Sequence, residues 1–220
     1  MGLAGLVLTR EGSLTLDRGL ALLQAVADAG GEAATISELA VAIGASRAAV
    51  YRLLVPLSER GLVWRDGNKV RLGVGLLRLA GQVLPQLREA ARPVLRELAE
   101  KVGATAHLSV AQGDQAQAVA VVEPSWTSFH VAYRVGTRHP LSAGAAGKAI
   151  TLRPGGGEGW VTSSGELEAG ASGVAAPVRG VPGLKASVGV VSLEPLDASV
   201  VGPAVVAAAV RLAEVLKQPE

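Results

Sequence analysis

The sequence has no cysteine, one methionine and, across 220 residues, only three tryptophans, two tyrosines and one phenylalanine. Without cysteine the chain can form no disulfide, no thiolate metal site and no thiol nucleophile. Its three histidines show no metal-ligand spacing, so we expect no metal and no cofactor. Charged residues make up 18% of the chain and hydrophobic residues 49%, which excludes intrinsic disorder and indicates a folded protein with a sizeable core.

Long hydrophobic runs are also absent. The most apolar stretch, residues 200–210, contains Pro203 and is shorter than the roughly 20 residues that a membrane span needs. Residues 3–8 are too short for the core of a signal peptide and lead directly into Arg10 and Glu11. We therefore expect a cytoplasmic protein with no membrane partner.

The first 60 residues contain three segments of helical periodicity. The first segment starts near Ser13 and ends at Gly30, and Thr35 and Glu38 have the spacing of a capping box at the start of the second. A short break then leads to Ser46, a predicted N-cap for the third helix. Three helices in this order are typical of a helix-turn-helix module.

The third helix has one apolar face and one basic face. The apolar face consists of Val50, Leu53, Leu54 and Leu57, and the opposite face of Arg47, Ala48, Tyr51 and Arg52. The first face is suited to a core, and the second would let the helix approach a polyanion closely. Pro56 also lies in this helix, and we expect it to bend or end the helix.

A predicted hairpin follows, with strands at residues 62–65 and 69–72 around a tight turn at 66–68. Helix, helix, helix and hairpin is the order of a winged helix-turn-helix, whose third helix enters the DNA major groove. Residues 44–72 hold six basic side chains against two acidic ones, whereas the rest of the chain holds 15 against 17. The predicted DNA-binding residues are Ser46, Arg47, Ala48, Tyr51, Arg52, Arg65, Lys69 and Arg71. The alternative is a protein-interaction adaptor whose arginines are merely solvated.

The remainder of the chain predicts a β-rich second domain. Helices are expected at residues 74–84, ending or kinking at Pro85, and at 87–102, 142–150 and 200–216. Strands are expected at residues 105–111, 116–122, 129–135, 174–178 and 186–193.

Several blocks of the sequence together resemble the IclR (isocitrate lyase regulator) family of bacterial transcription factors. The N-terminal blocks are LDRGLALL at residues 16–23, ISELA at 36–40, SRAAVYRLL at 46–54 and VRLG at 70–73. The later blocks are ARPVLRELA at 91–99, VGTRHPL at 135–141, GKAI at 147–150 and VAAPV at 174–178. The ordered set covers most of the chain.

The resemblance implies an α+β protein with a winged helix-turn-helix DNA-binding domain at residues 1–73, a linker helix at 74–85 and a GAF-like effector-binding domain at 86–220. It implies a homodimer or a dimer of dimers on double-stranded operator DNA, controlled by a small-molecule effector. We expect a regulator, with repression favoured, and not an enzyme, since no catalytic constellation is recognisable in the sequence. Glu166 and Glu168 are interpreted as part of a solvated loop.

The predicted effector site departs from the family pattern. Residues 151–158 are shorter than the helical material that family members carry there. The effector-binding residues implied by the resemblance are Leu141, Ala143, Gly144, Ser163, Gly173, Gly189 and Val191. Among the four aligned to polar family positions, only Ser163 is polar, which favours an apolar or aromatic effector or a sensor that no longer responds to one.

Overall fold

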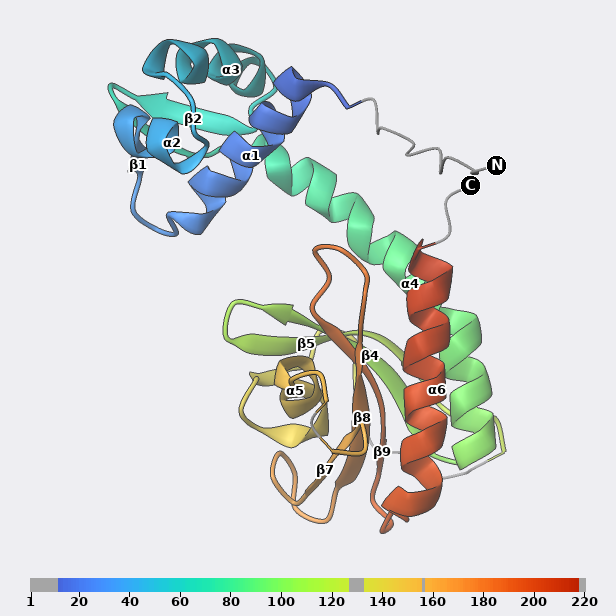
Figure 1. The fold of residues 1–220 in the computed structure, drawn as a ribbon. Coiled ribbons are helices and arrows are strands. Elements are labelled where there is room, and N and C mark those ends of the chain that lie inside the picture. Colours follow the sequence, from blue (N-terminus) through green and yellow to red (C-terminus); the bar gives the residue numbers. More distant parts are fainter. Residues whose placement is uncertain (1–11, 127–132, 156, 218–220) are drawn as a thin grey trace, which may run out of the picture. The chain divides into compact units, whose positions relative to one another are not determined.

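The computed structural model describes residues 12–126, 133–155 and 157–217 (Figure 1). The chain divides into two compact units, Met1–Gln82 and Val83–Glu220, and each has its own hydrophobic core. Helices and antiparallel sheets occur in both, which confirms the predicted α+β class.

The first unit contains three helices and a small sheet. The helices are α1 (Leu14–Asp28), α2 (Ile36–Ala42) and α3 (Arg47–Glu59). The strands are β1 (Ala34–Thr35), β2 (Val63–Asp66) and β3 (Lys69–Leu72), in the order β1-β3-β2. The buried core takes one face of each larger element and includes Leu22, Val26, Leu39, Val50, Leu54, Val63 and Val70. The predicted succession of helices and hairpin is confirmed, and β1 is an addition to it.

The capping box predicted at the start of α2 is present. The Thr35 backbone N–H donates to Glu38 Oε2 at 2.7 Å, and the Glu38 N–H donates to Thr35 Oγ1 at 3.2 Å. The Thr35 hydroxyl donates to the same carboxylate, and these bonds hold the pKa of Glu38 below its ordinary value. The Ile36 N–H also donates to the Asn68 carbonyl at 2.9 Å, which holds the start of α2 next to the hairpin.

The turn between α2 and α3 sets the angle of a helix-turn-helix. The two helices make an angle of 101°, and residues 43–46 connect them, with Gly44 at a φ of +59°. Only glycine adopts such a φ without steric cost. The angle lies in the range of about 90–120° known for helix-turn-helix motifs.

Pro56 does not end α3, contrary to one of the two outcomes expected for it. The helix runs on to Glu59, and the Pro56 carbonyl accepts from the Arg60 N–H at 3.3 Å. A proline nitrogen cannot donate to the Arg52 carbonyl one turn earlier, but both residues are exposed, so water can solvate that carbonyl.

A single helix, α4 (Gly75–Val102), replaces the two helices predicted on either side of Pro85. The prediction of a stop at Pro85 is wrong. The carbonyl that loses its donor belongs to the exposed Gly81, and the apolar stripe continues past the proline. Its buried side chains are Leu87, Ala91, Val94, Leu95, Leu98 and Ala99.

The second unit is built on a six-stranded antiparallel sheet in the order β6-β5-β4-β9-β8-β7. The strands are β4 (Thr105–Gln112), β5 (Gln115–Val122), β6 (Arg138–Pro140), β7 (Val161–Ser164), β8 (Ser172–Val178) and β9 (Ala186–Ser192). One face packs against α4 and α6 (Ala198–Lys217), and α5 (Gly144–Thr151) lies on the other (Figure 1). The strands predicted at 105–111, 116–122, 174–178 and 186–193 are confirmed, β6 and β7 are additions, and most of the strand predicted at 129–135 lies outside the described residues.

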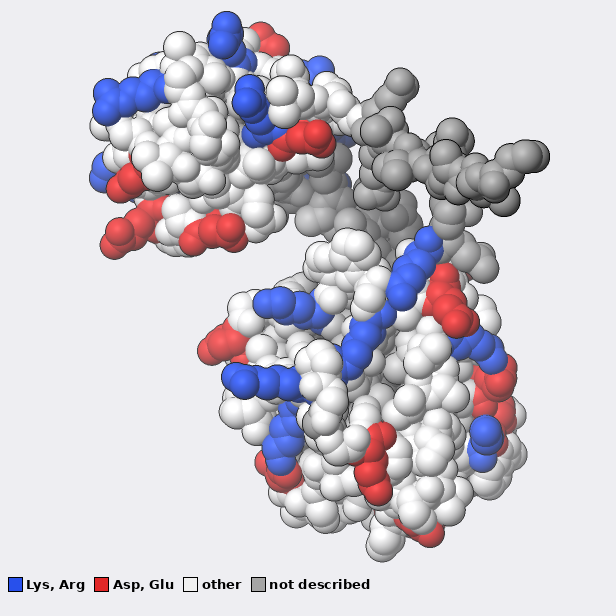
Figure 2. Space-filling model, viewed as in Figure 1, with Lys and Arg blue, Asp and Glu red and all other residues white. Residues whose placement is uncertain are grey.

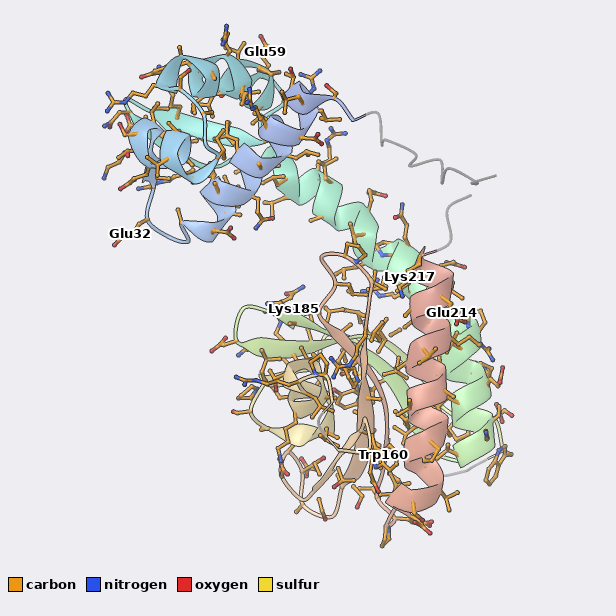
Figure 3. The ribbon with its side chains drawn as sticks, viewed as in Figure 1. Glu32, Glu59, Trp160, Lys185, Glu214 and Lys217 are labelled. Atoms are coloured by element: carbon orange, nitrogen blue, oxygen red, sulfur yellow. The ribbon has the colours of Figure 1, made fainter. Side chains whose placement is uncertain are left out.

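Within the described residues, α6 alone among unbroken helices is long and apolar enough to cross a membrane, and α2 with α3 meets the same criteria as a bent pair. Pro203 lies inside α6 and does not interrupt it, in agreement with the helix predicted at 200–216. One face of α6, including Val205, Ala209 and Leu212, is buried in the core of the second unit. Trp160 packs on this helix at Gly202, where its ring leaves no room for a side chain (Figure 3). The helix thus packs as a core helix of a folded domain.

Candidate nucleic-acid interface and ligand site

The outer face of α3 is exposed. Ser46 begins the helix, its hydroxyl accepting from the Ala49 N–H at 3.2 Å. All eight predicted DNA-binding residues have exposed side chains, namely Ser46, Arg47, Ala48, Tyr51, Arg52, Arg65, Lys69 and Arg71. The side of α3 opposite the core therefore presents cations, a hydroxyl and a small residue to solvent.

Tyr51 joins this helix face to the hairpin. The guanidinium carbon of Arg65 on β2 lies 5.3 Å from the centre of the Tyr51 ring. That distance is within reach of a cation–π contact. The structure therefore brings Arg65 together with the residues of α3, and a positive surface continues from the helix onto the strand.

The hairpin places Lys69 and Arg71 differently. Arg65 is opposite the buried Val70, whereas Arg71 is opposite Trp64 and Lys69 is opposite Asp66. Directly opposed residues share a face of a sheet, and successive residues alternate between faces. Lys69 and Arg71 therefore lie on the face that does not carry Arg65, beside a Trp64 that is 55% exposed.

Figure 2 shows basic side chains along the edge of the first unit where α3 and the hairpin lie. Acidic side chains gather on the edge below them in this view, where Glu32 is found (Figures 2 and 3). Glu59, at the end of α3, is an acidic residue on the basic side (Figure 3). In this view, the basic side chains of the first unit therefore lie mainly on the side of α3 and the hairpin.

In the second unit, the strand register brings the predicted effector residues together. One row across the sheet runs through Ser163, Gly173, Val191 and Thr105, and the next through Val161, Ala175, Gly189 and His107. These rows lie on the sheet face that α5 covers. Leu141, Ala143 and Gly144 lie at or just before the amino end of α5, so all seven predicted residues belong to one region.

This face carries more polar groups than the aligned positions indicated. Among the residues of the second unit that the structure describes, five polar ones are buried: Thr105, His107, Ser109, His139 and Ser187. The Ser187 hydroxyl donates to the Ala146 carbonyl at 2.9 Å and ties α5 to the sheet. The choice between an apolar or aromatic effector and a sensor that no longer responds stays a prediction. The alternation of polar and apolar residues at 105–110 was a usable signal, since period two in a strand separates its two faces.

His107 is fully enclosed. Burial lowers its pKa to about 3, with a smaller contribution from His139. Its ring centre lies 5.0 Å from that of Tyr133, and its Nδ1 is 3.4 Å from Ser109 Oγ. Burial also raises the pKa of Tyr133, which is hydrogen-bonded to Ser109. His107 is therefore an uncharged imidazole at neutral pH.

His139 lies on β6, where its side chain is 6% exposed. Its Nδ1 is 3.1 Å from the Pro140 carbonyl, to which it donates, and its Nε2 has no hydrogen-bond partner among the described residues. Over the described ranges, no three His, Asp or Glu side chains converge to hold a metal ion.

The amino end of α5 is occupied by two side chains from β7 and the loop after it. The Ala145 N–H donates to Ser163 Oγ at 2.9 Å, and the Gly144 N–H donates to Glu166 Oε2 at 3.0 Å. The Lys148 ammonium reaches the other carboxylate oxygen of Glu166 at 2.5 Å. Glu166 is an exposed loop residue, as interpreted from the sequence, and it also caps α5. The hydrogen bond from Lys148 and that from the Gly144 N–H hold the pKa of its carboxyl below the ordinary value.

The predicted glycines of this region are in close contact with their neighbours. A Cβ on Gly189 would lie 2.8 Å from both Ala175 Cβ and the Cε1 of His107. A Cβ on Gly173 would lie 3.1 Å from Ser163 Oγ. Glycine at these positions leaves room for α5 and for the His107 ring on the neighbouring strand, and the space that a polar family side chain would fill is taken.

Two family models match the chain in succession. The IclR helix-turn-helix domain matches residues 15–67, and the bacterial transcriptional regulator IclR C-terminal domain matches residues 84–153. Together they cover more than half of the chain. The chain belongs to the IclR family of bacterial transcription regulators. The second IclR match ends at residue 153, in the loop that is predicted to be shortened.

Curated relatives support this membership. The IclR-family chain is 33% identical over 148 residues to the HTH-type transcriptional regulator BhcR of Paracoccus denitrificans, covering 63% of this chain and 50% of that protein. It is 31% identical over 141 residues to the acetate operon repressor of Salmonella typhimurium, covering 62% and 51%. The chain thus spans about half the length of the curated relatives that it matches.

Solved IclR structures share the fold. A transcriptional regulator from Rhodococcus sp. RHA1 has 27% identity and a TM-score of 0.52, with 93% of this chain and 98% of that chain covered. An IclR homologue from Microbacterium hydrocarbonoxydans, complexed with 4-hydroxybenzoate, has 21% identity and a TM-score of 0.51, with 92% and 99% covered.

Proposed function

We propose that the chain is a sequence-specific DNA-binding transcription regulator that acts as a repressor on double-stranded operator DNA. The observation that carries this is the exposed basic face of α3, set at 101° to α2. Arg47, Tyr51 and Arg52 would contact base edges or nearby phosphates, Ala48 would allow close approach, and Ser46 would cap the helix next to a phosphate.

The hairpin would hold the DNA backbone. Arg65 is the strongest candidate, because its guanidinium already lies over Tyr51 on the same continuous surface. Lys69 and Arg71, on the other hairpin face, would reach phosphates only beyond the edge of that surface. Phosphate contacts position a protein on DNA, and base contacts specify the sequence.

The second unit would sense a small-molecule effector. In this proposal residues 1–73 bind DNA, 74–85 form the linker helix and 86–220 bind the effector. Leu141, Ala143, Gly144, Ser163, Gly173, Gly189 and Val191 surround the proposed ligand site. The buried polar face beneath α5 supports this role, because polar side chains rarely line a sheet that only has to pack. A regulator of chromosomal DNA works in the cytoplasm, where we place this one.

The chain would act as a homodimer or a dimer of dimers. Leu16 and Leu20, one helical turn apart on α1, are 60% and 56% exposed. Paired apolar side chains on one helix face are suited to an interface with a second copy. A two-fold dimer would in turn read a two-fold operator.

The proposal is tested by selecting bound DNA from a genomic pool and measuring affinity for the selected site at several salt concentrations. The wild type should show a steep negative dependence on salt. Arg52→Ala and Arg65→Ala should each weaken binding about tenfold, and Arg65→Ala should reduce the salt slope by about one. Arg153→Ala, which removes an exposed arginine from the second unit, is the matched control. Unchanged affinity in both variants would refute the interface, and no DNA binding by the wild type would favour a protein-interaction adaptor.

A further inference from the structure

The amino end of α5 already contains an anion. The backbone N–H groups at the start of a helix form a site with partial positive charge that suits a carboxylate. Here the carboxylate is Glu166, held by the Gly144 N–H at 3.0 Å and by Lys148 Nζ at 2.5 Å. Ala143, at the N-cap position, supplies no side-chain hydrogen bond of its own. A side chain from a different segment has therefore taken the place that a bound anion would take.

The loop that carries Glu166 also covers the same spot. Leu167 lies directly over Gly144, so that a Cβ added there would be 2.5 Å from Leu167 Cδ1. Gly144 has a φ of +69°, a conformation that favours glycine. Residues 166 and 167 thus close the amino end of α5 from outside, although both side chains remain partly exposed to water.

A second polar group at this place has no partner. His139 is 6% exposed, and the Cε1 of its ring is 3.6 Å from the position of that same added Cβ on Gly144. Its Nδ1 donates to the Pro140 carbonyl, and its Nε2 has no hydrogen-bond partner among the described residues. Buried polar atoms are normally hydrogen-bonded, so Nε2 needs a partner that the described residues do not provide.

We propose that Glu166 is a resident carboxylate that keeps the ligand site closed, and that a compact hydroxycarboxylate opens it. The ligand carboxylate would replace that of Glu166 at the Gly144 N–H and Lys148 Nζ, and its hydroxyl would donate to His139 Nε2. This inference rests on the proposed sensor role of the second unit. Only molecules in the open form can bind the ligand, so the apparent affinity is the intrinsic affinity multiplied by the fraction of open molecules. Removal of Glu166 raises that fraction and therefore strengthens binding without any new contact.

The test is an NMR titration of the full chain with glycolate, which has both groups, with acetate, which lacks the hydroxyl, and with glycolamide, which lacks the charge. The Gly144 amide and the His139 ring nitrogens are the reporters. In Glu166→Ala, glycolate should bind at least about tenfold more tightly than in the wild type. Glu168→Ala removes the same charge from the same loop without a side-chain contact to α5 and should behave as the wild type.

Three results would overturn the proposal. Equal glycolate affinity in Glu166→Ala and the wild type would show that Glu166 does not close the site. If acetate bound as tightly as glycolate, the proposed role of His139 would be wrong. If glycolamide bound as tightly as glycolate, the proposed role of the anion position would be wrong. Retention of the gained affinity in Glu166→Ala/Lys148→Met would remove the role of Lys148. If Glu166→Ala does not fold, Glu166→Gln replaces it, because glutamine keeps an acceptor for the Gly144 N–H but has no charge for Lys148. A glycolate affinity of Glu166→Gln equal to that of the wild type would again refute the proposal.

Operator binding is measured in the same variants. If no variant and no wild-type protein binds DNA, the proposed function fails, while the glycolate titration still decides the role of Glu166. If DNA binding persists and Glu166→Ala gains no ligand affinity, only the present inference fails.

Discussion

His107 lies on β4 with 4% of its side chain exposed, opposite Gly189 and beside the Tyr133 ring. His139, from β6, is the other titratable group that affects it. The folded state must keep His107 neutral, whereas the unfolded chain protonates it near pH 6.5. Because the folded pKa is depressed, its contribution to stability is complete above pH 6.5 and is lost as the pH falls toward 3.

We therefore expect the free energy of unfolding of the second unit to fall with pH below 6.5, by up to about 1.4 kcal/mol per pH unit from this group. His107→Gln removes the titrating ring and retains a polar side chain. The stability gap between wild type and variant, measured by urea unfolding at pH 7, 6 and 5, should shrink as the pH decreases. A gap that is constant over this range would contradict the neutral His107.

The sequence predicts the positions of some side chains but not those of others. The alternation at residues 105–110 marked Thr105, His107 and Ser109 as one face, because alternation is a local property. The contact between Glu166 and Gly144 had no such mark, since 22 residues separate the partners and a loop determines their approach. A carboxylate in a glycine-rich loop has the same local sequence whether it is solvated or caps a distant helix.

Three helices contain internal prolines, and in each the helix continues. Pro56 in α3, Pro85 in α4 and Pro203 in α6 all lack the N–H that closes a helical turn. Local propensity predicts a break, but the apolar stripes of these helices continue across each proline and remain packed. Burial of that stripe offsets the lost hydrogen bond, which is how tertiary packing overrides propensity.

Pro56 offers a test of this balance. Pro56→Ala restores a donor to the Arg52 carbonyl at an exposed position, so we expect the first unit to gain about 2 kcal/mol of stability. Thermal unfolding followed by circular dichroism measures the gain. Ala48→Gly in the same helix is the opposite control and should destabilise it by about 1 kcal/mol. A Pro56→Ala variant no more stable than the wild type would mean that the missing bond costs nothing in α3.

The sequence predicts an element boundary where a local hydrogen bond sets it, and misses an element that only pairing in the fold creates. The capping residues Ser46 and Thr35 fixed the starts of α3 and α2, because a cap is a short-range bond that the sequence displays directly. β7 was not predicted, because four residues with only one apolar side chain, Val161, give no clear strand pattern. Its place at the edge of the sheet follows from pairing with β8, which only the fold supplies.

At the scale of the molecule, the positive excess is confined to the segment that contains α3 and the hairpin. Residues 44–72 carry an excess of four positive charges, and the rest of the chain carries an excess of two negative ones. The sequence alone was sufficient for this division, for the fold class and for the family, because each depends on many residues at once. It was not sufficient for the state of the ligand site, which depends on a few contacts between distant segments.

The proposed dimer gives a prediction at this scale. Leu16→Glu/Leu20→Glu places two charges on the exposed face of α1, so we expect the dimer to dissociate and operator affinity to fall by at least about tenfold. Sedimentation velocity and a gel shift measure the two effects. Leu193→Glu changes an equally exposed apolar residue, 57% exposed, in the second unit and serves as the control. Dissociation by Leu193→Glu alone would place the interface in the second unit.

Because the protein contains few aromatic residues, the fluorescence of its tryptophans can report on separate parts of the molecule. Trp64 stands half exposed on the hairpin, and Trp160 packs on α6 at Gly202. Indole fluorescence shifts to longer wavelength in water and to shorter wavelength in a protein interior, so the two residues should emit in separable bands. With Trp126 replaced by Phe, one band would follow the hairpin as DNA is added and the other would follow the second unit as a ligand is added, in one cuvette and without a label.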